Sequence, residues 1–302
     1  MRSVLESLGF KQSYSDAAIY VMSKGDLRII LPVFVDDMTF VSQSLPAIED
    51  IIAQLRQHFK LRDLGPTTQL LGIKIDRDHS KHTISLSQHH YCLDILQRFG
   101  MADCKPVTTP MDPGLRLSHS QSPQTTQEAT QMRSIDYLGA VGVLMYLVTS
   151  TRPDIAYAVG VLARFNANPG LAHWNAVKHL FHYLKGTAHF ALTYGPDSSS
   201  SGLFVWLRNL LEEMGFSVSS PSILHTDNQS AIQVAKIPEH HGRMKHLNLR
   251  WFWLRDVVDQ GLISPVFVPT TEMPADLLTK PLARVKVQQF CEMLGLAPSW
   301  GS

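Results

Sequence analysis

The chain has 302 residues, of which 44% are hydrophobic and 18% are charged. This composition is typical of a soluble globular protein and excludes a disordered or fibrous one, and the length allows two or three domains. The net charge of +1 creates no global basic field, so any contact with nucleic acid has to come from local patches of charge.

The cysteines and the apolar segments indicate a compartment. Cys92, Cys104 and Cys291 are odd in number and widely spaced, which argues against a disulfide framework or a zinc ribbon and suits a reducing environment. The N-terminus lacks the apolar core of a signal peptide, and the most apolar stretch, residues 137–148, is too short to span a bilayer. We therefore expect a cytoplasmic or nuclear protein with no membrane partner.

The first third of the chain alternates between predicted strands and helices. Apolar patterning predicts strands at 27–35 and 38–41, a helix at 48–59, a hairpin at 70–75 and 83–86, and a helix at 88–99 that Gly100 ends. Residues 113–131 are rich in Ser, Gln and Thr without an apolar period, which predicts a solvent-exposed linker.

The second segment is predicted to be mainly helical, and the third returns to α/β alternation. Helices are expected at 137–148, from Arg152-Pro153-Asp154 onward and at 171–184, followed by a strand at 190–194 and a flexible Ser-rich break at 196–202. Further on we expect helices at 203–214, 228–235, 246–258 and 283–294, and strands at 222–226 and 262–268. This order predicts an α/β (α+β) fold with a partly parallel sheet.

Two adjacent carboxylates, Asp36 and Asp37, lie where the first two predicted strands meet. Like charges side by side at a hairpin tip are unfavourable unless water or a cation compensates them, and Mg²⁺ takes hard oxygen ligands of this kind. An Asp-Asp turn without a metal is the commoner interpretation of these residues alone, because Asp tolerates turn geometry.

Several motifs share one order with a known family. They are FVDDM (34–38), LRDLGPTTQLLGIKI (61–75), the segments 137–165 and 173–187, HTDNQSAI (225–232), RMKHLNL (243–249) and ADLLTKPL (275–282). In these motifs the chain resembles the C-terminal part of the Pol polyprotein of copia-type retrotransposons. The resemblance implies a partial reverse transcriptase palm and thumb at 1–112, a linker and helical connection at 113–194, and a truncated ribonuclease H-like domain at 203–302.

The resemblance assigns Asp36 and Asp37 to the acidic box of the polymerase, where the family holds Mg²⁺ or Mn²⁺. The family's third carboxylate lies on a separate strand well upstream, whereas only 35 residues precede Asp36 here. Asp16 is the most plausible substitute, but its surroundings resemble a different family segment. Without a third ligand and a fingers subdomain, we expect no autonomous polymerase activity.

The ribonuclease H resemblance is incomplete in a parallel way. Asp227 matches the third of the four metal-binding acids of that fold, and Asp276 matches the fourth. The first two belong near residues 194–203, where this chain has GPDSSSSG in place of three strands and the start of a helix. A sheet without those strands would have an unpaired edge.

Other interpretations of these third-segment residues stay open. Asp227 or Asn228 could cap the helix that follows, and Asp276 could be an N-terminal charge on a short helix. A basic stretch could contact the phosphates of a template–primer or an RNA–DNA hybrid, or could be a solvated helix face; it includes Arg243, Lys245, His246 and Arg250. Trp251, Phe252 and Trp253 could stack on bases, although core positions are the commoner role.

Three functions are compatible with the sequence. The chain could be an inactive fragment of a reverse transcriptase and ribonuclease H, or a non-enzymatic nucleic-acid-binding or interaction protein derived from the transposon. It could also be a working enzyme whose missing segments come from a second chain, such as another Pol fragment, or from a misassigned gene model. We favour the inactive fragment, because carboxylates of both metal sites are missing.

Overall fold

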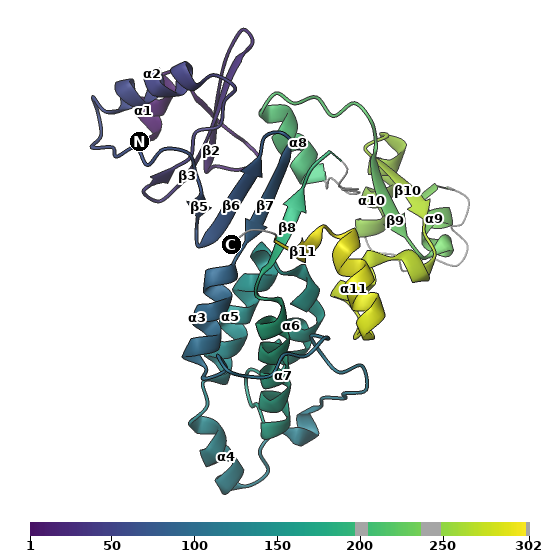
Figure 1. Ribbon diagram of the computed structural model, residues 1–302. Helices are drawn as coiled ribbons and strands as arrows, with labels where there is room; N and C mark the ends of the chain where they lie inside the picture. The colour runs from purple at the N-terminus through teal and green to yellow at the C-terminus, as the bar shows by residue number, and fades with distance from the viewer. Residues whose placement is uncertain (197–204, 237–248, 300–302) are drawn as a thin grey trace. The chain divides into compact units, whose positions relative to one another are not determined.

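The computed structural model describes residues 1–196, 205–236 and 249–299, with the backbone alone at 249–252 (Figure 1). The chain divides into two compact units. Unit 1 combines Met1–Thr67 with Ser201–Pro269, and unit 2 combines Thr68–Ser200 with Thr270–Ser302. The fold mixes helices and sheets, as the α/β prediction requires.

Unit 1 begins with a four-stranded antiparallel sheet in the order β1-β2-β3-β4. The strands are β1 (Lys11–Gln12), β2 (Ile19–Lys24), β3 (Leu27–Phe34) and β4 (Asp37–Met38), and the accompanying helices are α1 (Arg2–Ser7) and α2 (Leu45–Leu55). Alternate apolar residues of β2 and β3 point into one core together with Leu5, Phe10 and Leu55. Ser44 caps α2 by accepting a hydrogen bond from the N–H of Ala47 at 3.4 Å.

The rest of unit 1 contains a parallel pair of strands, β9 (Ser222–Thr226) and β10 (Ile263–Phe267), in register from Ser222 and Ile263 onward. The helices of this part are α8 (Val205–Glu213), α9 (Gln229–Lys236) and α10 (Leu249–Asp259). The expected parallel pairing is therefore confirmed.

Unit 2 has a five-stranded antiparallel sheet in the order β11-β8-β7-β6-β5. Its strands are β5 (Gln69–Leu70), β6 (Ile73–Asp78), β7 (Thr83–Ser87), β8 (Phe190–Tyr194) and β11 (Leu296–Pro298). Helices α3 (His89–Arg98), α5 (Tyr137–Ser150), α6 (Ala156–Ala163) and α7 (Leu171–Thr187) gather beside one another next to this sheet and share one apolar core (Figure 1). Helix α11 (Arg284–Met293) adds Val287 and Phe290 to that core.

The expected linker at 113–131 is wrong in part. Residues Thr126–Arg133 form helix α4, with a capping box in which Thr125 and Glu128 satisfy each other's backbone N–H groups. Met132 is buried, and the Ser122 hydroxyl donates to the carbonyl of Asn168 at 2.7 Å. A helix forms here because its capping box and the burial of Met132 compensate for the missing apolar period.

The predicted break at 196–202 lies almost entirely outside the described residues. The predicted domain boundaries at 112, 194 and 203 remain predictions about ancestry, whereas the compact units divide the chain after residues 67, 200 and 269. Within the described part of the chain, no helix is long and apolar enough to cross a membrane.

Candidate functional site

Asp36 and Asp37 lie at the tip of the β3–β4 hairpin. Phe34 pairs with Asp37, so Val35 and Asp36 form a two-residue turn. Val35 has a φ of +54°, a left-handed conformation that a β-branched residue rarely adopts. Its side chain is 78% exposed, and both carboxylates are exposed as well. The hairpin prediction is confirmed, and the strained turn presents two carboxylates to solvent.

The hairpin tip is supported by the core below it. Ile29 and Leu31 of β3 are fully buried against the unit 1 core. Beyond β4, the backbones of Ile30 and Val41 exchange two hydrogen bonds of 2.9 Å and so extend the pairing. A strained backbone persists only where its surroundings over-determine it, and this core supplies that restraint.

Within the described part of the chain, no third carboxylate completes a metal centre at this tip. Asp16 is at the same end of the sheet, since the N–H of Val33 donates to the carbonyl of Ala18 at 2.8 Å. However, the Asp16 carboxylate accepts the N–H of Ala18 at 2.9 Å and so supports its own turn. Among the described residues, no three His, Cys, Asp or Glu side chains are grouped to hold a metal ion. Asp36 and Asp37 fit only part of an Mg²⁺ ligand set.

Asp227 directly follows β9 and is exposed. The side chain of the next residue, Asn228, accepts the N–H of Ala231 at 3.0 Å. Of the two residues that could cap α9, Asn228 is therefore the one whose side chain does so.

Asp276 lies in the short 3₁₀ helix Pro274–Leu278 of unit 2 and is 8% exposed. Lys280 forms an ion pair with its carboxylate at 2.8 Å. A buried carboxylate requires a partner of opposite charge, and Lys280 supplies it. Asp227 belongs to unit 1 and Asp276 to unit 2.

The expected nucleic-acid contacts fall largely outside the described structure. Arg243, Lys245 and His246 lie outside the described residues, and the backbone alone of Arg250 is described, within α10. On the same helix Trp253 is 55% exposed, so the expected core position is wrong for this residue.

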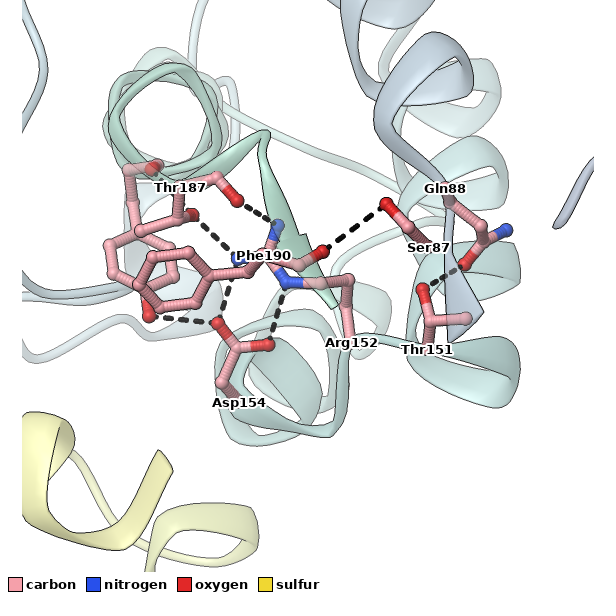
Figure 2. A network of polar contacts seen from close by, with 8 residues as sticks. Ser87, Gln88, Thr151, Arg152, Asp154, Thr187 and Phe190 are labelled. Atoms are coloured by element: carbon pink, nitrogen blue, oxygen red, sulfur yellow. Dashed lines mark hydrogen bonds and ion pairs between the residues drawn. The ribbon is translucent and has the colours of Figure 1, made fainter. Parts of the chain in front are cut away.

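A buried polar network in unit 2 was not foreseen from the sequence, although its Arg-Pro-Asp segment was recognised as a helix start. Arg152 donates to both oxygens of Asp154 at 3.0 and 2.8 Å, and to the carbonyl and hydroxyl of Thr187 at 3.0 and 2.6 Å. Figure 2 shows these contacts as dashed lines. The hydroxyl of Tyr183 also donates to Asp154 at 2.8 Å. Arg152 is 1% exposed and Asp154 is fully buried.

The network ties several elements of unit 2 together. It joins the 3₁₀ turn Pro153–Ile155 to the C-terminal end of α7, and the Arg152 guanidinium also lies 5.7 Å from the centre of the Phe190 ring in β8. Nearby, Thr151 donates to the side chain of Gln88 at 2.8 Å (Figure 2). Burial by itself lowers the pKa of Arg152, but the charge and hydrogen bonds of Asp154 raise it above its ordinary value. The arrangement stabilises the fold and is not a reactive site, because both charges are paired and shielded from solvent.

Comparisons with known proteins point to one group. Residues 1–113 match the family described as reverse transcriptase (RNA-dependent DNA polymerase). The chain is 33% identical to the retrovirus-related Pol polyprotein from transposon TNT 1-94 of Nicotiana tabacum, over 97% of this chain and 26% of that protein. It is 30% identical to the Pol polyprotein from transposon RE2 of Arabidopsis thaliana, over 98% of this chain and 24% of that protein. No solved structure matches the chain.

The chain is shorter than the region of each Pol polyprotein to which it aligns. The chain spans about a quarter of each Pol polyprotein. The two alignments extend over 351 and 356 positions, more than the 302 residues of the chain. Both relatives therefore contain residues, within the aligned region, that have no counterpart here.

Proposed function

From the fact that this chain belongs to the Pol polyprotein family of copia-type retrotransposons, we propose that its 302 residues are a segment of a reverse transcriptase and ribonuclease H that catalyses neither reaction by itself. The reverse transcriptase part is residues 1–113. The observation that carries the proposal is the exposed Asp36-Asp37 pair on its strained, core-supported turn.

In the polymerase part, Asp36 and Asp37 are proposed as ligands of Mg²⁺ or Mn²⁺. A metal ion held there would supply charge stabilisation to transferring phosphates. The hairpin holds the two carboxylates in place. Phe34 and Asp37 pair between β3 and β4, so the turn is fixed to the end of the sheet. Among the described residues no third carboxylate joins these two, so the ligand set of a two-metal site is incomplete there.

In the C-terminal part, we propose ribonuclease H ancestry for residues 203–302. Support comes from the parallel β9–β10 pair with its flanking helices and from an acidic residue directly after β9. The additional residues in the aligned Pol polyproteins agree with a missing stretch, which we place at 195–202. That stretch would contain the first two acids of the site, so Asp227 and Asp276 are proposed as remnants.

The proposed partner is nucleic acid, either a template–primer or an RNA–DNA hybrid. Arg243, Lys245, His246 and Arg250 provide cationic or protonatable groups in one short segment. Lysine and arginine contacts to phosphates give binding that weakens steeply with salt. Retention of this binding without catalysis would make the chain a nucleic-acid-binding protein of transposon origin.

The proposal is tested with the purified 302-residue chain in primer-extension and hybrid-cleavage assays that contain Mg²⁺. We expect no product above the level of Asp36→Asn. The matched control is Asp26→Asn, since Asp26 lies in the turn at the opposite end of β3. Extension that Asp36→Asn abolishes and Asp26→Asn leaves intact would refute the proposal for the polymerase part.

The ribonuclease H part has a separate test. Hybrid cleavage that disappears in Asp227→Asn would refute the proposed inactivity of that part. The binding test plots the logarithm of hybrid affinity against the logarithm of salt concentration. Replacing Arg243 and Lys245 by Ala should make the slope of this plot less steep by about one for each lost phosphate contact. An unchanged salt dependence would argue against the proposed nucleic-acid surface.

A further inference from the structure

The loop between β1 and β2 surrounds a carboxylate from a distant part of unit 1. Glu213, the last residue of α8, accepts the Ser13 hydroxyl at 2.6 Å, the N–H of Tyr14 at 2.8 Å and the N–H of Ser15 at 3.2 Å on one oxygen. Its other oxygen accepts the Ser15 hydroxyl at 2.6 Å. Four neutral donors thus converge on one anion.

The loop also has hydrogen bonds of its own. Ser13 is 8% exposed, and its hydroxyl oxygen also accepts the N–H of Asp16 at 3.0 Å. Asp16 in turn accepts the N–H of Ala18 at 2.9 Å. Successive N–H groups pointing into one concavity form an anion-binding nest, and two hydroxyls widen it here. We call residues Ser13–Ser15 the serine cradle.

Helix geometry gives no reason for a carboxylate at the position of Glu213. A negative charge at the C-terminal end of a helix is disfavoured by the helix dipole. The cradle outweighs this effect: hydrogen bonds from the hydroxyls of Ser13 and Ser15 lower the pKa of Glu213 to about 2. The carboxylate is therefore an ionised occupant of the cradle at neutral pH.

Two neighbours of the cradle suit a larger ligand than a carboxylate. The side chain of Tyr14 is 99% exposed directly beside the donors, and an exposed aromatic ring can stack on a base. Trp206, also on α8, donates its indole N–H to the carbonyl of Ser15 at 2.9 Å. Helix α8 thus contacts the cradle through both Glu213 and Trp206.

We propose that the serine cradle is a binding site for a phosphate group of a nucleotide or polynucleotide, and that Glu213 occupies it as an internal competitor. A phosphate presents several oxygens to the same four donors, and it gains their hydrogen bonds when Glu213 leaves. Tyr14 adds stacking when the phosphate carries a base. The site uses none of the carboxylates of the proposed metal sites. Failure of the proposed metal sites would therefore leave this proposal unaffected, and failure of this proposal would leave them unaffected.

The test compares phosphate binding by the full chain and its variants, measured by calorimetry with inorganic phosphate, a nucleoside 5′-monophosphate and a single-stranded oligonucleotide. Glu213→Ala removes the competitor and should tighten binding of inorganic phosphate about tenfold or more, as expected if the cradle is open for a tenth of the time or less. Glu212→Ala, a carboxylate beside it on the same helix, should bind like the unmodified chain.

Further variants identify the donors and the source of the phosphate. Adding Ser13→Ala and Ser15→Ala to Glu213→Ala should abolish the gain. Adding Tyr14→Ala should weaken the nucleotide and the oligonucleotide but leave inorganic phosphate unchanged. If Glu213→Ala lowers the folded fraction by circular dichroism, Glu213→Gln, which keeps the size and removes the charge, takes its place.

Two outcomes would overturn the proposal. One is phosphate affinity that stays the same when Glu213 is replaced. The other is a gain that survives the loss of both hydroxyls, since the ligand would then bind elsewhere. Equal effects of Tyr14→Ala on all three probes would refute the nucleotide assignment.

Discussion

Replacing Asp154 by Asn should destabilise unit 2 strongly. The substitution keeps the size of the side chain but leaves the Arg152 guanidinium, which is 1% exposed, without its counter-charge. Arg152 would keep hydrogen bonds to Thr187 at 3.0 and 2.6 Å, so the loss is mainly that of charge compensation.

The magnitude follows from burial. Removing one partner of a fully buried ion pair costs about 3–5 kcal/mol, because an uncompensated charge remains in the interior. For a unit of this size, 1 kcal/mol shifts the melting temperature by roughly 2–4 °C, so we expect a decrease of roughly 6 to 20 °C. The same change at Asp76, whose side chain is 53% exposed in an ion pair of 3.0 Å with Lys74, should cost less than about 1 kcal/mol.

Thermal unfolding followed by circular dichroism measures both variants. The double variant Arg152→Met and Asp154→Leu should recover much of the loss, since an apolar pair of similar volume requires no charge compensation. A melting temperature for Asp154→Asn within 2 °C of that for Asp76→Asn would refute the buried-charge reasoning.

Three further predictions concern other parts of the chain. Val35→Gly should stabilise unit 1 by about 1 kcal/mol in denaturant titration, because glycine adopts the φ of +54° without the strain of a β-branched residue. A loss of stability would show that the valine side chain is needed. Asn228→Ala should lower the free energy of unfolding by about 1 kcal/mol through loss of the α9 cap, and Asp227→Ala should lower it less. A larger loss for Asp227→Ala in the same titration would contradict the assignment of the cap. Burial, with a further contribution from the charge of Asp154, raises the pKa of Cys291 to about 12, so stability should be fully present below pH 9 and decrease as the pH rises toward 12. Melting temperatures of Cys291→Ala should fall less over that range, and an equal fall would exclude the thiol as a cause.

The local elements were largely predictable because their signals are local. Helix α3 ends where Gly100 takes a φ of +67°, as expected from a glycine after an apolar helix. Helix α4 was missed because its only signal is the capping box of Thr125 and Glu128, which an apolar period does not reveal. Strand β11 was missed because three residues at a sheet edge have no pattern of their own and form only by pairing with β8.

The candidate sites divide in the same way. Adjacent carboxylates at a turn are visible in the sequence, so Asp36 and Asp37 were found. Which of Asp227 and Asn228 caps α9 was undecidable, since both residue types favour that position, and one hydrogen bond of 3.0 Å settled it. Glu213 gave no signal at all, because its donors are 198 to 200 residues away.

The sequence by itself determined the family, the order of most of the elements and the acidic hairpin, since these depend on motifs and on apolar periods along the chain. Only the tertiary structure decided that Val35 adopts a strained turn, that Arg152 and Asp154 form a buried pair, and that Glu213 occupies the serine cradle. The physical reason is that backbone strain, charge compensation and convergence of donors depend on distances in space, which folding sets between residues that sequence spacing does not relate.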